Sequence, residues 1–291
     1  MKYRAIGKSG LRVSVLGLGS WLTYGGSSIP DQQAVDLVHR AYDLGINYFD
    51  TANVYQGGAA ERLLAKALTG IPRASVVLAT KAFWPVGPGP NDRGLSRKHL
   101  VESVNRSLER LNTDYLDVFF CHRFDAEVPL EETLSTLDQL VRAGKILYVG
   151  VSEWTAAQME RAVGLQVAHG WEPIRVSQPR YNLLHRDIET EVIPTSERAG
   201  IGQVVWSPLA EGFLTGKYRE DAPPPADSRR RPAPRIQHPG LHDTGQLRGR
   251  ATAGGGSRER RHAARPHGAR VDDSPPQCGG DHHRRIAPQS A

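Results

Sequence analysis

The chain has 291 residues, which is long enough for one large α/β domain with a substantial buried core. It contains no run of about twenty apolar residues, which argues against a membrane-spanning helix. The N-terminus lacks the apolar stretch of a secretion signal, and the two cysteines, Cys121 and Cys278, give no disulfide framework. These features predict a cytoplasmic protein with no membrane segment.

The formal net charge of +6 is concentrated at one end of the chain. Residues 1–221 contain 24 basic and 25 acidic side chains, whereas residues 222–291 contain 13 and 6. The last aromatic residue is Tyr218, and the segment beyond it is rich in Arg, Pro and Gly. Such a composition cannot bury enough apolar surface to offset the entropy of ordering. We therefore predict a folded body over residues 1–221 and a disordered tail over residues 222–291.

Apolar periodicity predicts the elements in chain order. A small hairpin is expected over residues 2–13, with its turn at Lys8–Gly10. Short strands are then predicted at residues 13–18, 46–49, 75–79, 115–120, 146–151, 174–177 and 202–206. Helices are predicted between them, from Asp31 as N-cap to just before Gly45, and at residues 59–68, 96–111, 130–141, 155–167 and 189–198.

Repeated βα units with short buried strands indicate a parallel sheet. The segment GLGSWLTYGG after the first strand lacks the G-x-G-x-x-G spacing of a dinucleotide-binding open sheet. Seven units in succession favour a (β/α)8 barrel instead, but a complete barrel needs an eighth unit. No apolar periodicity follows residue 221, so the barrel is predicted to be incomplete.

Reactive side chains stand at the ends of three predicted strands. GINYFD ends on Asp50, with Tyr55 five residues later; VVLATK ends on Lys81, and YLDVFFCH ends on His122. In a barrel, the C-terminal ends of the strands meet at one face, so these groups are expected to form a proton-transfer site. Taken singly, Asp50 could be a helix cap, Tyr55 a loop residue, Lys81 a solvated lysine and His122 a core residue.

No metal site is predicted, because the body has no second ligand pair with zinc spacing beside Cys121, His122 and Asp125. Cys121 is interpreted as small core packing.

Longer stretches of the sequence resemble a known family. They read YRAIGKSGLRVSVLGLGSW, GINYFDTANVYQGGAAE, GLSRKHLVESVNRSLERL, DYLDVFFCHRFD, VGVSEW and VWSPLAEGFLTGKY, and they cover about residues 3–221. Together they resemble the aldo-keto reductases, most of all the branch with the potassium-channel β subunits and their bacterial relatives. The channel subunits have Asn where His122 stands, and on that point this sequence is closer to the active reductases.

The resemblance implies NADP(H)-dependent reduction of an aldehyde or ketone. It implies that Tyr55 is the general acid, with Lys81 supplying positive charge beside it so that it can act near neutrality. Asp50 would hold Lys81 in its charged form, and His122 would orient the carbonyl. The resemblance also implies a cofactor site made of Ser20, Trp21, Asp50, Ser152, Gln178, Trp206, Ser207, Pro208, Leu209, Gly212 and Lys217.

Within the resemblance, Trp206 would stack on the nicotinamide while Ser152 and Gln178 bond its carboxamide. Ser207, Leu209 and Gly212 would follow the pyrophosphate and Lys217 would neutralise phosphate, whereas Trp21 would wall the substrate pocket.

The adenosine-phosphate contacts of the family lie after its eighth strand, a segment that this chain does not show. The tail is either a genuine basic extension that binds nucleic acid or, as we favour, out-of-frame translation of a GC-rich gene. In the second case, loss of the eighth unit would impair cofactor binding and stability.

Three functions stay open at this stage. The first is a reductase acting on a small carbonyl substrate, with homo-oligomers left open and no nucleic acid expected. The second is a non-enzymatic NADP-binding subunit like the channel β subunits. The third, a basic nucleic-acid binder, rests on residues 222–291 alone, because the body is near neutral.

Overall fold

The computed structural model describes residues 1–26, 29–218 and 223–225. All of these residues lie within the compact unit Met1–Arg231. The predicted disordered tail therefore lies almost wholly outside the described residues. Within these residues no helix has the length and apolar character needed to cross a membrane.

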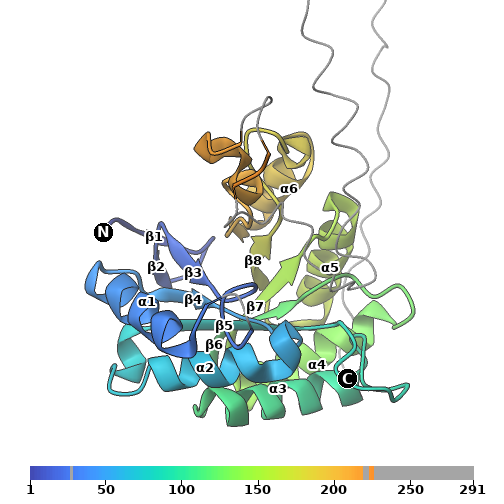
Figure 1. Cartoon of the computed structure of the whole chain (residues 1–291). Helices are drawn as coiled ribbons and strands as arrows, with labels where there is room; N and C mark the ends of the chain where they lie inside the picture. Colours follow the sequence, from blue (N-terminus) through green and yellow to red (C-terminus); the bar gives the residue numbers. More distant parts are fainter. Residues whose placement is uncertain (27–28, 219–222, 226–291) are drawn as a thin grey trace, which may run out of the picture. The chain divides into compact units, whose positions relative to one another are not determined.

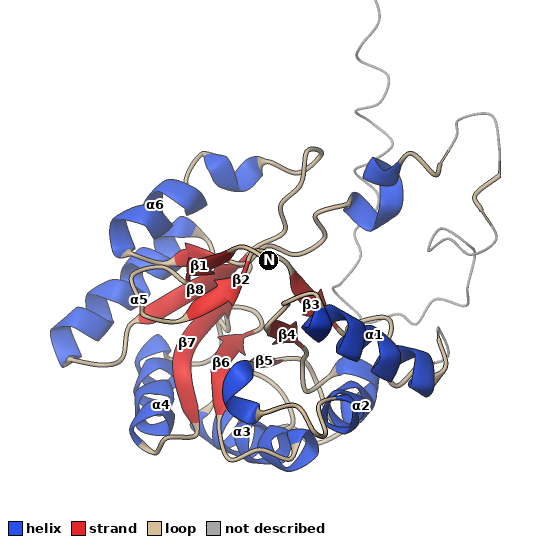
Figure 2. Ribbon diagram, turned by 90° about the vertical axis from the view of Figure 1, so that its left-hand side faces the viewer, coloured by secondary structure: helices blue, strands red, loops and turns tan. Residues whose placement is uncertain are grey.

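Seven parallel strands form one curled sheet in the order β3-β4-β5-β6-β7-β8-β9. Their bounds are β3 Gly17–Gly19, β4 Tyr48–Asp50, β5 Val77–Ala82, β6 Leu116–Cys121, β7 Ile146–Ser152, β8 Ile174–Gln178 and β9 Gly202–Gln203. The strands follow an arc with the helices on its outside (Figures 1 and 2). This architecture confirms the predicted α/β fold, an incomplete (β/α)8 barrel.

Six α-helices connect or follow these strands: α1 Asp31–Asp43, α2 Ala59–Ala67, α3 Arg97–Leu111, α4 Leu130–Arg142, α5 Ala156–His169 and α6 Val192–Ala199. Short 3-10 helices are η1 Tyr55–Gly58, η2 Arg73–Ser75, η3 Asp187–Glu189 and η4 Ala210–Thr215. Apart from the strand predicted over residues 13–18, the existence and type of the predicted strands and helices are confirmed, and most boundaries differ by a few residues.

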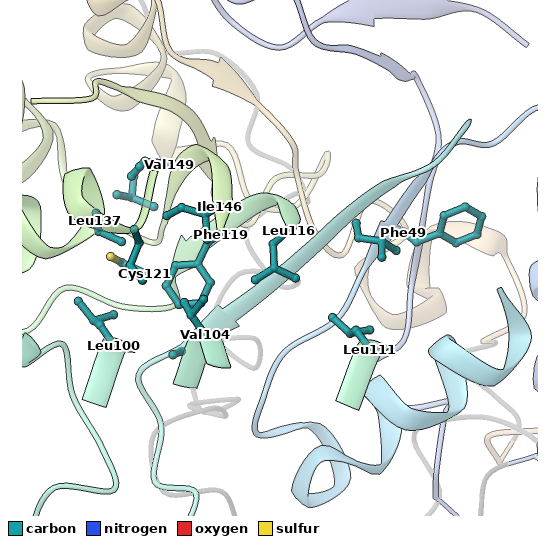
Figure 3. Close-up of a cluster of buried hydrophobic side chains, with 14 of the residues drawn as sticks. Phe49, Leu100, Val104, Leu111, Leu116, Phe119, Cys121, Leu137, Ile146 and Val149 are labelled. Carbon is teal, nitrogen blue, oxygen red and sulfur yellow. The ribbon is translucent and has the colours of Figure 1, made fainter. Parts of the chain in front are cut away.

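The central strands β5 and β6 are buried on both faces, as parallel strands under helices are. Along β6, Phe119 and Cys121 point outward into the cluster against the helices, and Val118 and Phe120 point into the barrel. Figure 3 shows the outer cluster, in which Phe119 packs near Val104 of α3. Because side chains alternate along a strand, this two-sided burial fixes which strand-end residues face the barrel interior.

The N-terminal hairpin is present, with β1 Tyr3–Ala5 antiparallel to β2 Arg12–Ser14. The single strand predicted over residues 13–18 is wrong. Ser14 Oγ donates to the main-chain oxygen of Leu16 at 2.6 Å, and the chain turns there. The first barrel strand, β3, therefore begins only at Gly17.

Two of the six α-helices in the described residues start with a side-chain cap. Ser96 caps α3 by accepting from the His99 amide, and Thr155 caps α5 in a capping box with Gln158. The predicted cap at Asp31 is wrong, because Pro30 precedes α1 and no side chain caps it. Asp31 instead lies in the first turn, where a carboxylate interacts favourably with the helix dipole.

The first and last strands of the sheet, β3 and β9, are each paired on one side only within the described residues. Beside β9, the side-chain amide of Gln203 is buried with neither its oxygen nor its nitrogen bonded in that part of the chain. Nearby Val205 is 37% exposed. As far as the described residues go, the sheet thus has two free edges, a feature that complete barrels avoid.

Candidate active site

Strand alternation brings the predicted catalytic residues to one place. Asp50 lies on the same face of β4 as the inward-pointing Tyr48. Lys81 lies on the same face of β5 as Val77 and Ala79. His122 continues the inward face of β6. All three stand at the C-terminal ends of neighbouring strands β4, β5 and β6. The predicted convergence of these groups is therefore present in the structure.

Lys81 is the centre of this cluster and is 1% exposed. Its Nζ forms a short ion pair with Asp50 Oδ1 and donates to the main-chain oxygen of Thr51 at 2.7 Å. The same Nζ lies 3.5 Å from the hydroxyl oxygen of Tyr55, at the outer limit of hydrogen bonding. Burial lowers the pKa of Lys81, but Asp50 and Tyr55 together outweigh it, so the net pKa is raised. Lys81 is therefore a cation at neutral pH.

Tyr55 begins η1, directly after the loop that follows β4. Burial raises the pKa of its phenol, and the charge of Asp50 adds to the rise, while Lys81 and Arg123 act in the opposite direction. The net pKa lies above the ordinary value, so the expected lowering by Lys81 is present but smaller than the effect of burial. Tyr55 therefore carries its proton at neutral pH, as a proton donor must.

His122 is 5% exposed and its ring centre lies 5.9 Å from that of Tyr55, edge to face. Its amide donates to the main-chain oxygen of Ala82 at 3.0 Å, which joins β6 to β5 beyond the last strand pair. Burial, with the nearby cations Lys81 and Arg123, lowers the pKa of His122 well below its usual value. The imidazole is therefore neutral at pH 7, and its buried Nδ1 has no partner in the described residues.

The neutral state of His122 predicts a pH-dependent stability. Its pKa is 6.5 in a model peptide and lower in the folded chain, so the unfolded chain binds one more proton below that pH. The free energy of unfolding should fall by about 1.4 kcal/mol per pH unit as the pH drops below 6.5. The free energy of unfolding, measured with urea at several pH values, should depend less steeply on pH in His122→Gln. Burial also lowers the pKa of His99, so His99→Gln should likewise reduce the dependence of the free energy of unfolding on pH. Identical slopes in all three chains would contradict the assignment.

Two predicted cofactor residues join the cluster from the next strands. Gln178, at the end of β8, donates from Nε2 to Asp50 Oδ2 at 2.8 Å. Ser152, at the end of β7, donates from Oγ to the main-chain oxygen of Gln178 at 2.9 Å. Ser20, which follows β3, is 1% exposed, and its hydroxyl has no partner in the described residues. Six strands, β3 to β8, thus contribute polar groups to one end of the barrel.

The other predicted cofactor residues are Trp21, Trp206 and five residues on the segment after β9. The ring of Trp21 is 6.4 Å from that of Tyr55. Trp206 donates from Nε1 to Glu153 Oε1 at 2.6 Å. The segment after β9 carries the other five, Ser207, Pro208, Leu209, Gly212 and Lys217. Ser207 has φ of +56°, and its buried hydroxyl has no partner among the described residues. The side chains of Pro208, Leu209 and Lys217 are exposed.

Three residues beside the cluster were not predicted from the sequence: Trp84, Arg123 and Glu153. The ring of Trp84 lies 6.3 Å from that of His122, and Arg123 follows His122 directly. Glu153, with φ of +58°, accepts from the Arg180 amide and from Trp206. All three stand just beyond strand ends, so the rule that found His122 could also have identified them.

The described residues contain no group of three or more His, Cys, Asp or Glu side chains that could hold a metal ion. Burial raises the pKa of the Cys121 thiol to about 12, so this cysteine is an inert core residue.

A cavity of about 570 Å³ lies away from the cluster around Lys81, between α4, α5 and the segment that leads into β8.

Comparison with known proteins identifies the family. The sequence model of the "Aldo/keto reductase family" matches residues 15–253. The chain belongs to the aldo/keto reductase family. The match extends past residue 221, where the change in composition predicted the end of the body.

Curated relatives within the aldo/keto reductases carry channel names. The chain is 45% identical over 232 residues to a "Probable voltage-gated potassium channel subunit beta" of Arabidopsis thaliana, covering 79% of this chain and 70% of the relative. It is 46% identical over 235 residues to a protein of the same name from Oryza sativa subsp. japonica, with the same coverage. A "Putative voltage-gated potassium channel subunit beta" of Schizosaccharomyces pombe is 42% identical over 225 residues, covering 76% and 65%. The resemblance to the channel-β branch is thus confirmed.

Proposed function

We propose that the chain is an aldo/keto reductase that uses NADPH to reduce a small aldehyde or ketone, with Tyr55 as the general acid. The observation that carries the proposal is the buried Lys81 cation, held between the carboxylate of Asp50 and the phenol of Tyr55. Burying a lysine with a carboxylate in this way costs desolvation energy, and such sites are commonly functional. The expected location of this reductase is the cytoplasm.

The residues at the end of the barrel fit the nicotinamide end of the cofactor. Ser152 and Gln178 present polar groups next to Asp50, and Trp206 offers an indole held in place by Glu153. The buried, unpartnered hydroxyl of Ser207 is available to a phosphate oxygen on the segment after β9. The part of the family's site that would hold the adenosine phosphate falls outside the described residues.

The side chains of the cluster divide the chemistry among them. The hydride is supplied by NADPH when it is bound. His122, neutral and buried, would hydrogen-bond to the carbonyl oxygen and orient it beside Tyr55. Tyr55 would donate its proton to that oxygen as negative charge develops, and Lys81 would stabilise the resulting phenolate. A positioned acid contributes about 10²–10⁴ in rate, and stabilisation of the oxyanion adds to it.

We further propose that this reductase is impaired. The free edges of β3 and β9 and the unpartnered amide of Gln203 support a missing eighth βα unit. The change in composition after residue 221 supports a frameshift in the gene, although the family match runs to residue 253. Sequencing the gene region tests this directly: an eighth-strand motif in another reading frame would support a frameshift, and its absence from every frame would refute it.

The second candidate function is a non-enzymatic, NADP-binding regulatory subunit. The names of the relatives from Arabidopsis thaliana and Oryza sativa subsp. japonica favour it. His122 favours the enzyme, because the channel subunits are expected to have Asn at this position. A homo-oligomer would be compatible with either function.

Consumption of NADPH distinguishes the two functions. The purified full chain is incubated with NADPH and a panel of small aldehydes, and cofactor absorbance and alcohol formation are followed together. The reductase predicts matched losses of NADPH and aldehyde, with cofactor binding weaker than in intact relatives. Binding of NADPH measured by fluorescence, without consumption on any aldehyde, would support the regulatory subunit instead.

A further inference from the structure

Arg123 places a guanidinium beside the proposed proton-transfer groups. Its Nη1 donates to the main-chain oxygen of His122 and lies 3.4 Å from Ser152 Oγ. Its Cζ lies 5.5 Å from the centre of the Trp84 ring. The charge of Arg123 also contributes to lowering the pKa values of both His122 and Tyr55. The guanidinium is therefore fixed between the ends of β6 and β7, within electrostatic reach of the reacting groups.

Arg123 has no carboxylate partner in the part of the chain that the structure describes. Among the described residues, no Asp or Glu lies within ion-pair distance of it. Arg73 and Arg110, which are also partly buried, pair with Asp117 and Glu61. Arg180 is like Arg123 in having no ion pair among the described residues. Burial lowers the pKa of Arg123, which is the response of a cation that is desolvated without full compensation.

The acidic side chain that acts electrostatically on Arg123 accepts its hydrogen bonds from other groups. Glu153 attracts Arg123 electrostatically, but its Oε1 accepts from the Arg180 amide and from Trp206 Nε1, both at 2.6 Å. Within the described part of the chain, Nε and Nη2 of Arg123 donate to no acceptor. One edge of the guanidinium is thus left for another molecule.

Trp84 adds a second donor without an acceptor. Its Nε1 is buried and donates to nothing in the described residues, and its ring lies between those of Phe83 and His122. A buried donor costs free energy unless an acceptor meets it. Arg123 also lacks an ion pair within the described residues, because Asp50 pairs with Lys81. An anion would satisfy both requirements.

We propose that Arg123 binds an anionic group on the substrate, so that the site selects small carbonyl compounds with a carboxylate or phosphate near the carbonyl carbon. The proposal rests on the proposed reductase function and specifies its substrate class. A guanidinium can donate two parallel hydrogen bonds to either anion, whereas the neutral residues of the site cannot provide such a pair. Because Arg123 is adjacent to His122, only an anion close to the reacting carbonyl can reach it.

Matched substrate pairs test this specificity. Pyruvate is compared with methyl pyruvate, and glycolaldehyde phosphate with glycolaldehyde, using kcat/KM of the full chain with NADPH. The unaltered chain should prefer the anionic member of at least one pair. A preference within the pyruvate pair identifies a carboxylate as the bound group, and a preference within the glycolaldehyde pair identifies a phosphate. Arg123→Gln should reduce that preference at least about tenfold, mainly through KM. Arg123→Lys should retain part of it, and Arg161→Gln, on the outer face of α5, should retain all of it.

The outcomes separate this inference from the proposed function. If neutral carbonyls are reduced but the preference for anions is absent, or is unchanged in Arg123→Gln, the inference is overturned and the reductase stands. If Arg123→Gln weakens NADPH binding and affects all substrates equally, the residue serves the cofactor and the inference is overturned. If no carbonyl is reduced, the proposed function fails. Calorimetric titration with pyruvate and inorganic phosphate then decides: binding lost in Arg123→Gln supports the anion site, and no binding refutes it.

Discussion

Replacing Tyr55 by phenylalanine should lower kcat for carbonyl reduction by about 10²–10⁴. The substitution removes only the hydroxyl, which lies 3.5 Å from Lys81 Nζ, and keeps the ring between those of Trp21 and His122. The proton donor is lost while the shape of the site is retained. Turnover of a small aldehyde and NADPH binding should be measured on the same preparation, and binding should change little.

The matched control is Tyr115→Phe. Tyr115 stands just before β6, at the opposite end of that strand from His122, with Arg73 over its ring at 4.0 Å. This control should retain full turnover. Equal losses in Tyr55→Phe and Tyr115→Phe would point to a general effect on folding and not to the removal of an acid.

Replacing Asp50 by asparagine should lower the free energy of unfolding by about 3–5 kcal/mol, because it leaves the Lys81 cation buried without its carboxylate. The pKa of Lys81 should fall as well, since Asp50 is the largest of the groups that raise it. The double variant Asp50→Asn/Lys81→Met should recover part of this stability and remain inactive. Urea unfolding at pH 7 measures both effects.

An exposed ion pair provides the comparison for Asp50 and Lys81. Glu160 and Arg198, 57% and 66% exposed, lie 2.9 Å apart on α5 and α6. Glu160→Gln should cost no more than about 1 kcal/mol. If Asp50→Asn costs as little as Glu160→Gln, the buried pair at the centre of the proposed site does not have the electrostatic role that the structure gives it.

Strand periodicity was sufficient to predict most of the fold. Val118, Phe119, Phe120 and Cys121 form a continuous apolar run, a local feature of the sequence that predicts a strand buried on both faces. Boundaries were harder, because they depend on local hydrogen bonds. The hydrogen bond from Ser14 to Leu16 splits one predicted strand into β2 and β3, and Pro30 precedes the helix that Asp31 was expected to cap.

The candidate site was predictable where residues stand at strand ends, as Asp50, Lys81 and His122 do. Contacts between distant segments were not predictable, because no local pattern links their members. Gln178 bonds to Asp50 across 128 positions of sequence, and Glu153 holds Trp206 across 53. The direction of the pKa shift of Tyr55 also could not be predicted from the sequence, because the effect of burial on this pKa exceeds that of the neighbouring Lys81 cation.

The central claim is that the assembled cluster around Lys81 performs carbonyl reduction, and isotope transfer tests it most directly. The full chain is incubated with a small aldehyde and NADPH labelled with deuterium at the transferable position, and the alcohol is examined by mass spectrometry. We predict deuterium at the former carbonyl carbon with the unaltered chain, and its near-complete loss with Tyr55→Phe. Absence of deuterated alcohol from a sample in which the cofactor is shown to be bound would contradict the claim.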